Sequence, residues 1–443
     1  MHPPPTGSGD PQTATVVILR GRLDGPASPA VGQALQDAYA AGAQRLILDC
    51  TALEYLSSAG IRVLLLAAQQ GKARGGHITL QHVRPHVREV LALTGLLDVL
   101  HVESGPGAPP SSRMPRASAA LREASERDLQ AAIQEIHAHY RTSDDGEVAT
   151  YIPELSKANP DHFGVCVATA DGRIFSAGDC DQPFTLQSIS KPFVFALALE
   201  AFGDEQVSRR VGVEPSGDAF NSIELQAGTN RPCNPMINAG AITTTALLHA
   251  KHGADTFELL RERLSAAAGR TLELDQAVYE SERRTGHRNR AIAHLLLNFG
   301  MVHDEAEAAL DVYFRQCSIL VTCRDLALMG ATVANLGRHP VTGAEVFSAP
   351  TMRQMLAVMF TCGMYDYSGE WAYRVGVPAK SGVSGGLMAV VNRQIGLATY
   401  SPRLDARGNS ARGIEACVDL TGRFGLHAFD ALNAGSNFLK VLA

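Results

Sequence analysis

Short apolar runs alternate with helically spaced apolar residues in the first part of the chain. Three short, mainly apolar runs, typical of buried strands, lie at residues 16–19, 46–48 and 78–80. Each run is followed by apolar residues at helical spacing, in residues 31–39, 61–66 and 87–93. Ser28-Pro29 at the start of the first helical segment is a typical helix start signal. The alternation of strands and helices predicts an α/β domain.

The region after residue 118 has a different order of elements. One face of an amphipathic helix is formed by Leu129, Ala132, Ile133, Ile136 and Tyr140. Two strands joined by an Asp-Gly turn follow, and then helical segments at residues 190–202, 239–251, 304–316 and 350–360. The region ends on strand-like runs at residues 387–391 and 395–400. Strands at both ends of the region predict an α+β domain with an antiparallel sheet built from both ends.

Two stretches rich in Pro, Gly and Ser divide the chain. Its 443 residues are enough for two to three domains. The first stretch predicts a disordered tail over residues 1–12, and the second predicts a flexible linker over residues 105–117. The sequence therefore predicts one domain over residues 13–104 and a second over residues 118–443.

Composition and charge exclude several classes of protein. Hydrophobic residues make up 45% and charged residues 19%, which is typical of a globular protein. The net charge of −6 makes nucleic acid an unexpected partner. The first residues lack the basic and apolar regions of a signal peptide, and the apolar runs are too short to span a membrane, so we expect a cytoplasmic protein. The eight cysteines include no C-x-x-C pair, which predicts buried free thiols and no metal site.

A serine and a lysine three residues apart precede the first long apolar helix of the second domain. In this S-x-x-K pattern, Ser188 and Lys191 share one helix face and are suited to act as nucleophile and base. Lys191 must lose its proton for this role, which requires burial or a neighbouring positive charge. The pattern alone is weak, because a helix-capping serine followed by a surface lysine gives the same spacing.

A second lysine motif strengthens the hypothesis. Lys380-Ser381-Gly382 directly precedes the strand at residues 387–391. S-x-x-K followed by K-[ST]-G is the layout of the penicillin-recognising serine enzymes. The Ser-Asp-Asn motif of those enzymes is absent, as is an export signal. The two motifs favour an acyl-transfer serine enzyme with a cytosolic substrate.

Several longer strings make the second domain similar to the serine-dependent glutaminases. The resemblance runs from about residue 120 to the C-terminus and depends on YIPEL at 151–155, QSISKP at 187–192, EPSG at 214–217, NPMINAGAI at 234–242, SE…RN within 281–289, CGMYD at 362–366 and PAKSGV at 378–383. It implies a β-lactamase/DD-peptidase-like fold. The implied reaction is hydrolysis of L-glutamine to L-glutamate and ammonia.

The resemblance assigns roles to matching residues. It implies that Ser188 is the nucleophile, that Lys191 takes its proton, and that Tyr365 relays a proton to the departing ammonia. The backbone N–H groups of Ser188 and Val383 would form the oxyanion hole. The implied substrate-binding set is Tyr151, Gln187, Ser188, Asn238, Glu282, Asn289, Tyr313, Tyr365 and Val383. Within it, Glu282 supplies a countercharge for the substrate ammonium, and the two asparagines supply donors for its carboxylate.

Each of these residues also has a structural interpretation. Asn238 precedes Ala239-Gly240 and could cap a helix, and Glu282 lies beside two arginines and could form a surface ion pair. Tyr313 and Tyr365 could be core aromatics. The resemblance implies no metal or organic cofactor, and it implies a homo-oligomer, dimer or tetramer.

The first domain resembles the STAS domain, a family that includes the anti-sigma factor antagonists. The loop after the second strand reads Ser57-Ser58-Ala59-Gly60. The antagonists carry a phosphorylated serine where this chain has Ala59, so we expect no phosphorylation switch. Ser57 and Ser58 are instead expected to cap the following helix. A protein partner, oligomerisation or sensing is the expected role of this domain.

Two other functions are compatible with parts of the sequence. A penicillin-binding or β-lactamase-type enzyme would share the fold, but the chain lacks both Ser-Asp-Asn and an export signal. A purely regulatory protein would work through the first domain. A catalytically dead second domain, however, is expected to have lost Ser188, Lys191 or Lys380, and all three are present.

Overall fold

The chain folds into two compact units, residues 1–115 and 116–443. The computed structural model describes residues 15–23, 27–56, 58–73, 76–84, 87, 88, 91, 100–102, 119–217, 223, 225–302 and 306–429. The predicted tail and the predicted linker lie outside these residues, so their bounds stay predictions. Each unit is described separately below.

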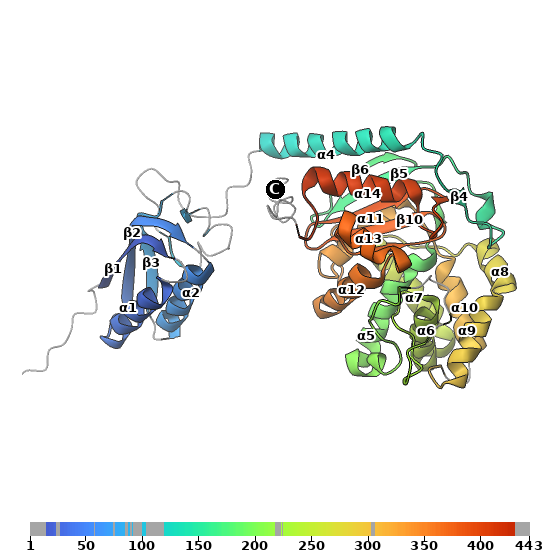
Figure 1. The fold of residues 1–443 in the computed structure, drawn as a ribbon, viewed down its shortest axis with the longest axis horizontal. Coiled ribbons are helices and arrows are strands. Elements are labelled where there is room, and N and C mark those ends of the chain that lie inside the picture. Colours follow the sequence, from blue (N-terminus) through green and yellow to red (C-terminus); the bar gives the residue numbers. More distant parts are fainter. Residues whose placement is uncertain are drawn as a thin grey trace, which may run out of the picture. The chain divides into compact units, whose positions relative to one another are not determined.

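The first unit is a parallel sheet with helical crossovers (Figure 1). Its strands β1 (Thr15–Leu23), β2 (Arg45–Leu56) and β3 (His77–Gln81) lie in the order β1-β2-β3. Helix α1 (Ser28–Ala40) connects the first pair and α2 (Ser58–Ala73) the second. Leu46 and Leu48 of the central strand are fully buried, and Leu35 of α1 packs in the same core. The predicted α/β domain is confirmed.

Two details of the first unit lie outside the described residues. Ser57 is not among the described residues. For Ser58 and Ala59, at the start of α2, only the backbone is described. The capping role expected of the two serines therefore stays a prediction. The helix expected over residues 87–93 is described only at residues 87, 88 and 91, where it is helical.

The second unit is built around an antiparallel sheet in the order β6-β5-β11-β10-β9. The strands are β5 (Gly164–Thr169), β6 (Ile174–Gly178), β9 (Ala379–Ser381), β10 (Gly386–Val391) and β11 (Ile395–Tyr400). The first two form the predicted hairpin, in which Gly172 has the positive φ of 91° that favours glycine. β5 pairs with β11 over its full length, so strands from both ends of the unit meet in one sheet, as predicted.

Alternate residues of the strands face two different cores. Val165 and Val167 of β5 lie in one core with Leu129 and Ile133 of α4 (Ala119–Tyr140). Cys166 and Ala168 lie in the other core, which includes residues of α11 (Cys323–Ala334). α4 and α14 (Ala411–Phe424) thus cover one face of the sheet and α11 covers the other, with the remaining helices beyond it (Figure 1). This layering confirms the α+β prediction.

Further helices surround the second core. They are α5 (Ser190–Ser208), α6 (Asn238–His252), α7 (Thr256–Ala268), α8 (Gln276–Thr285), α9 (His287–Asn298), α10 (Ala306–Cys317), α12 (Ala349–Cys362) and α13 (Ser368–Arg374). The 3₁₀ helices are η1 (Leu155–Lys157), η2 (Gln187–Ile189), η3 (Gly253–Asp255) and η4 (Tyr365–Tyr367). Two small sheets pair β12 (Arg403–Leu404) with β4 (Glu147–Val148) and β7 (Phe184–Thr185) with β8 (Leu320–Val321).

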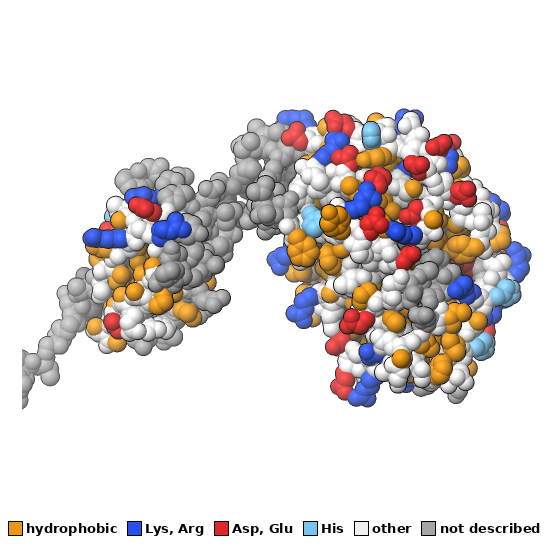
Figure 2. Space-filling model, in the orientation of Figure 1, with side chains coloured by type: hydrophobic (Ala, Val, Ile, Leu, Met, Phe, Trp, Pro, Cys, Tyr) orange, Lys and Arg blue, Asp and Glu red, His pale blue; other side chains and the backbone are white. Residues whose placement is uncertain are grey.

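The visible surface of the second unit carries charges of both signs. Figure 2 shows Lys and Arg side chains interspersed with Asp and Glu over this face. Charged side chains of this unit form ion pairs, such as Arg423–Glu135 at 2.7 Å and Arg407–Glu370 at 2.9 Å. None of the described helices is both long and apolar enough to cross a lipid bilayer.

Candidate active site

Ser188 lies in a tight turn that leads into a buried helix. It is the middle residue of η2, and α5 begins two residues later. Gln187 has a φ of 50°, a conformation that non-glycine residues rarely adopt and that often marks functional sites. The Ser190 hydroxyl donates to the Gln187 carbonyl at 2.8 Å and stabilises this turn. Ser188 is 7% exposed, so its hydroxyl is shielded from most solvent.

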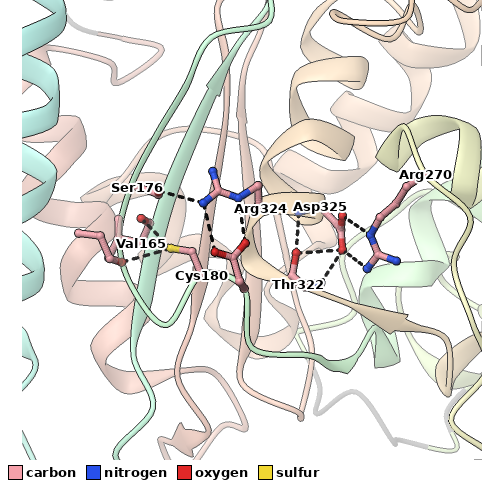
Figure 3. A network of polar contacts seen from close by, with 9 residues as sticks. Val165, Ser176, Cys180, Arg270, Thr322, Arg324 and Asp325 are labelled. Atoms are coloured by element: carbon pink, nitrogen blue, oxygen red, sulfur yellow. Dashed lines mark hydrogen bonds and ion pairs between the residues drawn. The ribbon is translucent and has the colours of Figure 1, made fainter.

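A polar network fixes the strand segment that precedes this turn (Figure 3). The Cys180 thiol donates to the Val165 carbonyl at 3.2 Å, and Arg324 pairs with Asp181 at 3.0 Å. Arg324 belongs to the first turn of α11, which begins with a capping box between Thr322 and Asp325. Hydrogen bonds and an ion pair therefore connect the segment that precedes Ser188 to α11, which packs against the sheet.

Lys191 is fully buried one turn after Ser188. Its amine donates to the Asn238 side-chain oxygen at 2.6 Å. Burial lowers the pKa of Lys191 to about 8, although the nearby Cys317 and Glu282 act in the opposite direction. The alternative of a capping serine with a surface lysine is wrong, because Lys191 has no exposed surface and α5 has no side-chain cap.

Asn238 connects two of the predicted site residues. It is the first residue of α6, and no side chain caps this helix, so the capping interpretation is wrong. Its oxygen accepts from Lys191, and its amide nitrogen donates to the Asn289 side-chain oxygen at 2.9 Å. Gly240 allows this helix to begin here, because a Cβ at that position would lie 2.0 Å from the Asn234 carbonyl oxygen.

Glu282 is a buried carboxylate on α8. It is 7% exposed, and its Oε2 atom makes no hydrogen bond with the described residues. Arg283 and Arg284 point to solvent instead, so the surface ion-pair interpretation is wrong. Burial raises the pKa of Glu282 to about 8, while the charge of Lys191 acts to lower it. An unpaired buried carboxylate is costly unless a ligand brings a cation to it.

The predicted tyrosines lie around these polar groups. Tyr365 and Tyr313 are buried, and burial raises the pKa of both phenols. The nearby Ser188 hydroxyl opposes this rise of the pKa at Tyr365, so the two hydroxyls lie close to each other. Tyr365 has a φ of 58°, a second strained backbone position in the site. Tyr151 as a residue is 55% exposed, but burial of its phenol and, second, the charge of Glu282 raise its pKa well above the usual range.

A glycine brings the Tyr365 segment against the sheet. A Cβ at Gly363 would lie 1.8 Å from the Ala379 carbonyl oxygen, so no other residue allows this approach between the end of α12 and β9. Tyr365 follows two residues later and so lies over the K-S-G strand. The Nζ atom of Lys191 is 5.7 Å from the centroid of the Tyr365 ring.

Val383 lies in the turn between β9 and β10. The hydroxyl of the adjacent Ser384 donates to the Thr185 carbonyl at 2.6 Å. A Cβ at Gly382 would lie only 3.1 Å from the Leu186 carbonyl oxygen, so this turn packs tightly against the segment before Ser188. The backbones of Ser188 and Val383 thus belong to two closely packed segments, as an oxyanion hole requires.

The structure brings the predicted set into one region of the second unit, in which Tyr151 is 55% exposed and Lys191 is fully buried. Sequence reasoning did not assign roles to Lys380, Ser381, Asn409 or Cys317, which also lie here. Ser381 donates to Asn409 at 2.6 Å, and the buried thiol of Cys317 lies beside Tyr313. Only the K-S-G motif gave a signal for any of them. That the chain needs no metal or cofactor stays a prediction.

Comparisons with known proteins agree with this geometry. The glutaminase family matches residues 146–429, and the Mlab, STAS domain family matches residues 9–101. Glutaminase 2 of Bradyrhizobium diazoefficiens is 53% identical over 71% of this chain, which spans about half (51%) of that relative's length. Glutaminase of Trichormus variabilis is 51% identical over 68% of this chain and 90% of its own length.

Solved glutaminase structures have the same fold. A structure of Mglu in its glutamate form has a TM-score of 0.66 and 43% identity over 68% of this chain and 70% of its own. A probable glutaminase, ybaS, has a TM-score of 0.66 and 39% identity over 69% of this chain and 99% of its own. The chain therefore belongs to the glutaminase family and carries a STAS domain at its N-terminus.

Proposed function

We propose that this chain hydrolyses L-glutamine to L-glutamate and ammonia through a glutamyl ester on Ser188. The observation that carries the proposal is the buried carboxyl group of Glu282, whose Oε2 makes no hydrogen bond with the described residues and which lies near the Lys191–Asn238 pair. A carboxylate in that state fits a ligand that carries an ammonium group. An α-amino acid has such a group, and the names of the relatives point to glutamine.

The first half of the reaction forms the ester. Neutral Lys191 takes the proton of Ser188 as the serine oxygen attacks the side-chain carbonyl carbon of glutamine. The backbone N–H groups of Ser188 and Val383 hold the oxyanion that develops. Tyr365 then gives its proton to the amide nitrogen, the C–N bond breaks and ammonia leaves. Protonated Lys191 returns a proton to the Tyr365 oxygen, which restores both groups.

The second half of the reaction hydrolyses the ester. Water attacks the ester carbon, and Lys191 accepts its proton. The C–O bond to Ser188 breaks, and Lys191 returns the proton to the serine oxygen. Glutamate leaves the site, so the enzyme ends in its starting protonation state.

Substrate selection depends on pairing all charged groups of glutamine. Glu282 binds the α-ammonium, and the side chains of Asn238, Asn289, Tyr151 and Tyr313 lie around it to bind the α-carboxylate. Gln187 extends this lining beside the nucleophile. Because a shorter substrate cannot reach Ser188 while these contacts are made, asparagine is rejected.

The direct experiment is glutamate release from L-glutamine by the purified chain, with Ser188→Ala beside it. We expect turnover by the wild type and a loss of about 10³-fold or more in the variant. No glutamate release from a folded wild type, with and without phosphate, would contradict the proposal. Turnover of a chromogenic cephalosporin in place of glutamine would favour the β-lactamase-type alternative.

We further propose that the STAS unit regulates the enzyme or assembles it into a homo-oligomer. The support is its separate hydrophobic core and the location of every candidate site residue in the other unit. Binding of a partner protein to the STAS unit would also agree with this separation from the candidate site. The mass of the full chain in solution, measured by light scattering, tests the oligomer, and a monomer would contradict that part.

A further inference from the structure

Lys380 is a buried amine to which the proposed reaction gives no role. It lies in the middle of β9, at the edge of the sheet, opposite Met388 of β10. Its side chain has no exposed surface, and Nζ donates to the neighbouring Ser381 carbonyl at 2.8 Å. Burial of a lysine costs free energy, so a site that keeps one has a use for the amine.

The amine of Lys380 lies against the face of the Tyr365 ring. Nζ is 3.7 Å from the ring centroid, compared with 5.7 Å for Lys191 Nζ. The Tyr365 backbone is in the left-handed region, which a residue other than glycine keeps only where the surrounding structure holds it. The close approach at Gly363 brings the ring to this amine.

The charges around Lys380 favour a neutral amine. Burial is the largest cause that lowers its pKa well below the usual range, and the charge of Lys191 is the second. Among the described residues, no acidic side chain acts to raise it. A neutral amine directs N–H bonds at the electron-rich ring face without competing with Lys191 for the serine proton.

We propose that Lys380 is a positioning residue that holds the Tyr365 phenol in line with the departing nitrogen. Its N–H groups contact the ring face, and its alkyl chain occupies the space beneath the ring. Without this support the ring can turn about its side-chain torsions, and the hydroxyl then misses the nitrogen. The inference rests on the proposed function, in which Tyr365 protonates the leaving group.

The test uses Lys380→Met, which keeps the length and apolar volume of the side chain but removes its N–H groups. Two substrates are compared, L-glutamine and the γ-methyl ester of L-glutamate. Ammonia leaves only after its nitrogen is protonated, whereas methoxide is a far better leaving group and depends less on Tyr365. We expect kcat on glutamine to fall by about 10- to 100-fold with KM within about twofold, and kcat on the ester to change less than about threefold.

A double-mutant cycle separates this role from a purely structural one. In a Tyr365→Phe background, Lys380→Met is expected to change kcat on glutamine by less than about twofold, because the hydroxyl it positions is already gone. The matched control is Lys251→Met, which removes an exposed lysine whose Nζ lies 5.2 Å from the Phe202 ring centroid, and it should leave both substrates unaffected. Lys380→Gln gives a second test if the Met variant lowers Tm strongly, and the same split between amide and ester is expected.

Three results would overturn the inference. They are equal losses on the amide and the ester, additive effects in the cycle, or a raised KM with unchanged kcat. A wild type that releases no glutamate from glutamine would instead refute the proposed function. The two failures are therefore distinguishable.

Discussion

The basic side chain of Lys191 and the acidic side chain of Glu282 are both buried in the candidate site. Each has a pKa of about 8. Burial is the main cause for both, but it acts in opposite directions. It favours the neutral amine of Lys191 and the neutral acid of Glu282. Near pH 8 the average charges of the two groups therefore cancel, whereas at lower pH both groups are mostly protonated and the pair carries a net positive charge. A zwitterionic substrate supplies an ammonium that favours the ionised form of Glu282.

This arrangement predicts an acidic limb in the pH profile. As pH falls through about 8, Lys191 gains a proton and can no longer act as the base, and Glu282 gains one and can no longer pair with an ammonium. We expect kcat/KM for glutamine to fall by about tenfold or more per pH unit below this range and to level off above it. Initial rates at subsaturating glutamine measure the profile. Because the two groups attract each other, the apparent pKa values belong to the pair.

Glu282→Gln separates the two contributions. It should raise KM strongly at every pH. The remaining acidic limb of the kcat/KM profile should then reflect the protonation of Lys191 alone. Glu280→Gln, an exposed residue two positions earlier on α8, is the control and should keep the wild-type profile. A flat kcat/KM between pH 6 and about 9 in the wild type would contradict both assignments.

At the residue scale, the sequence was most informative where residue types have few alternative uses. S-x-x-K, K-S-G and the longer strings identified the residues that the structure brings together around Ser188. The contact between Lys191 and Asn238 and the stacking of Lys380 on Tyr365 were not predictable. They join residues 47 and 15 positions apart, and spacing along the chain carries no information about such contacts.

At the scale of elements, the strands and the amphipathic helix α4 were predicted from their periodicity. α11 was missed although it is rich in apolar residues, and the structure buries it on nearly all sides. α8 was missed for the opposite reason, since it is short and mostly polar. Periodicity identifies elements that have both apolar and polar faces; α11 has few exposed residues and α8 has few apolar ones.

The close approach at Gly363 predicts a strong effect of a single methyl group. Gly363→Ala would place a Cβ 1.8 Å from the Ala379 carbonyl oxygen, so α12 and β9 must separate. We expect a loss of about 2–3 kcal/mol in the free energy of unfolding, which corresponds to a Tm lower by roughly 5–10 °C. Because Tyr365 and Lys380 move apart, kcat should also fall. Thermal unfolding and glutaminase assays measure both effects.

Gly369→Ala is the matched control for this substitution. Gly369 lies in α13, and a Cβ there would meet nothing within 4 Å. Alanine is the better helix former, so Tm should stay the same or rise slightly. An equal Tm for the two variants would show that the close approach at Gly363 does not make a side chain there destabilising.

The start of α11 supports the segment that carries Ser188. Asp325 accepts from the Thr322 N–H at 2.7 Å and forms a two-pronged pair with Arg270, at 2.9 and 2.6 Å (Figure 3). We expect Asp325→Ala to cost about 2–3 kcal/mol, because it removes the cap and leaves Arg270 without its partner. Urea unfolding measures the loss. Glu205→Ala, which removes an exposed i,i+4 pair with Arg209, is the control and should have little effect; a similar loss in both variants would contradict the assignment.

At the scale of the whole molecule, the chain separates catalysis from a second task. All candidate site residues lie between residues 151 and 383, inside the unit 116–443. The two-domain organisation was predictable because a stretch rich in Pro, Gly and Ser separates the two regions. The role of the STAS unit was not, since the residues of its loop resemble the antagonists only in part.

Removing the first unit should leave the chemistry intact. We expect residues 116–443 to fold and to hydrolyse glutamine with KM within about threefold of the full chain, because the unit has its own cores and contains every candidate site residue. If the STAS unit assembles or regulates the enzyme, light scattering will show a smaller assembly, or kcat will change. Loss of all turnover by a folded fragment would show that the site needs the first unit. An unchanged assembly and an unchanged kcat would contradict the role proposed for it.

The covalent intermediate gives the most direct test of the account. The full chain is mixed with L-glutamine, quenched in acid within the first turnovers and digested, and the peptides are analysed by mass spectrometry. We predict a glutamyl group on the peptide that contains Ser188, and none on the same peptide of Ser188→Ala. Glutamate release with no adduct on Ser188, or with an adduct on a different residue, would contradict the proposed mechanism.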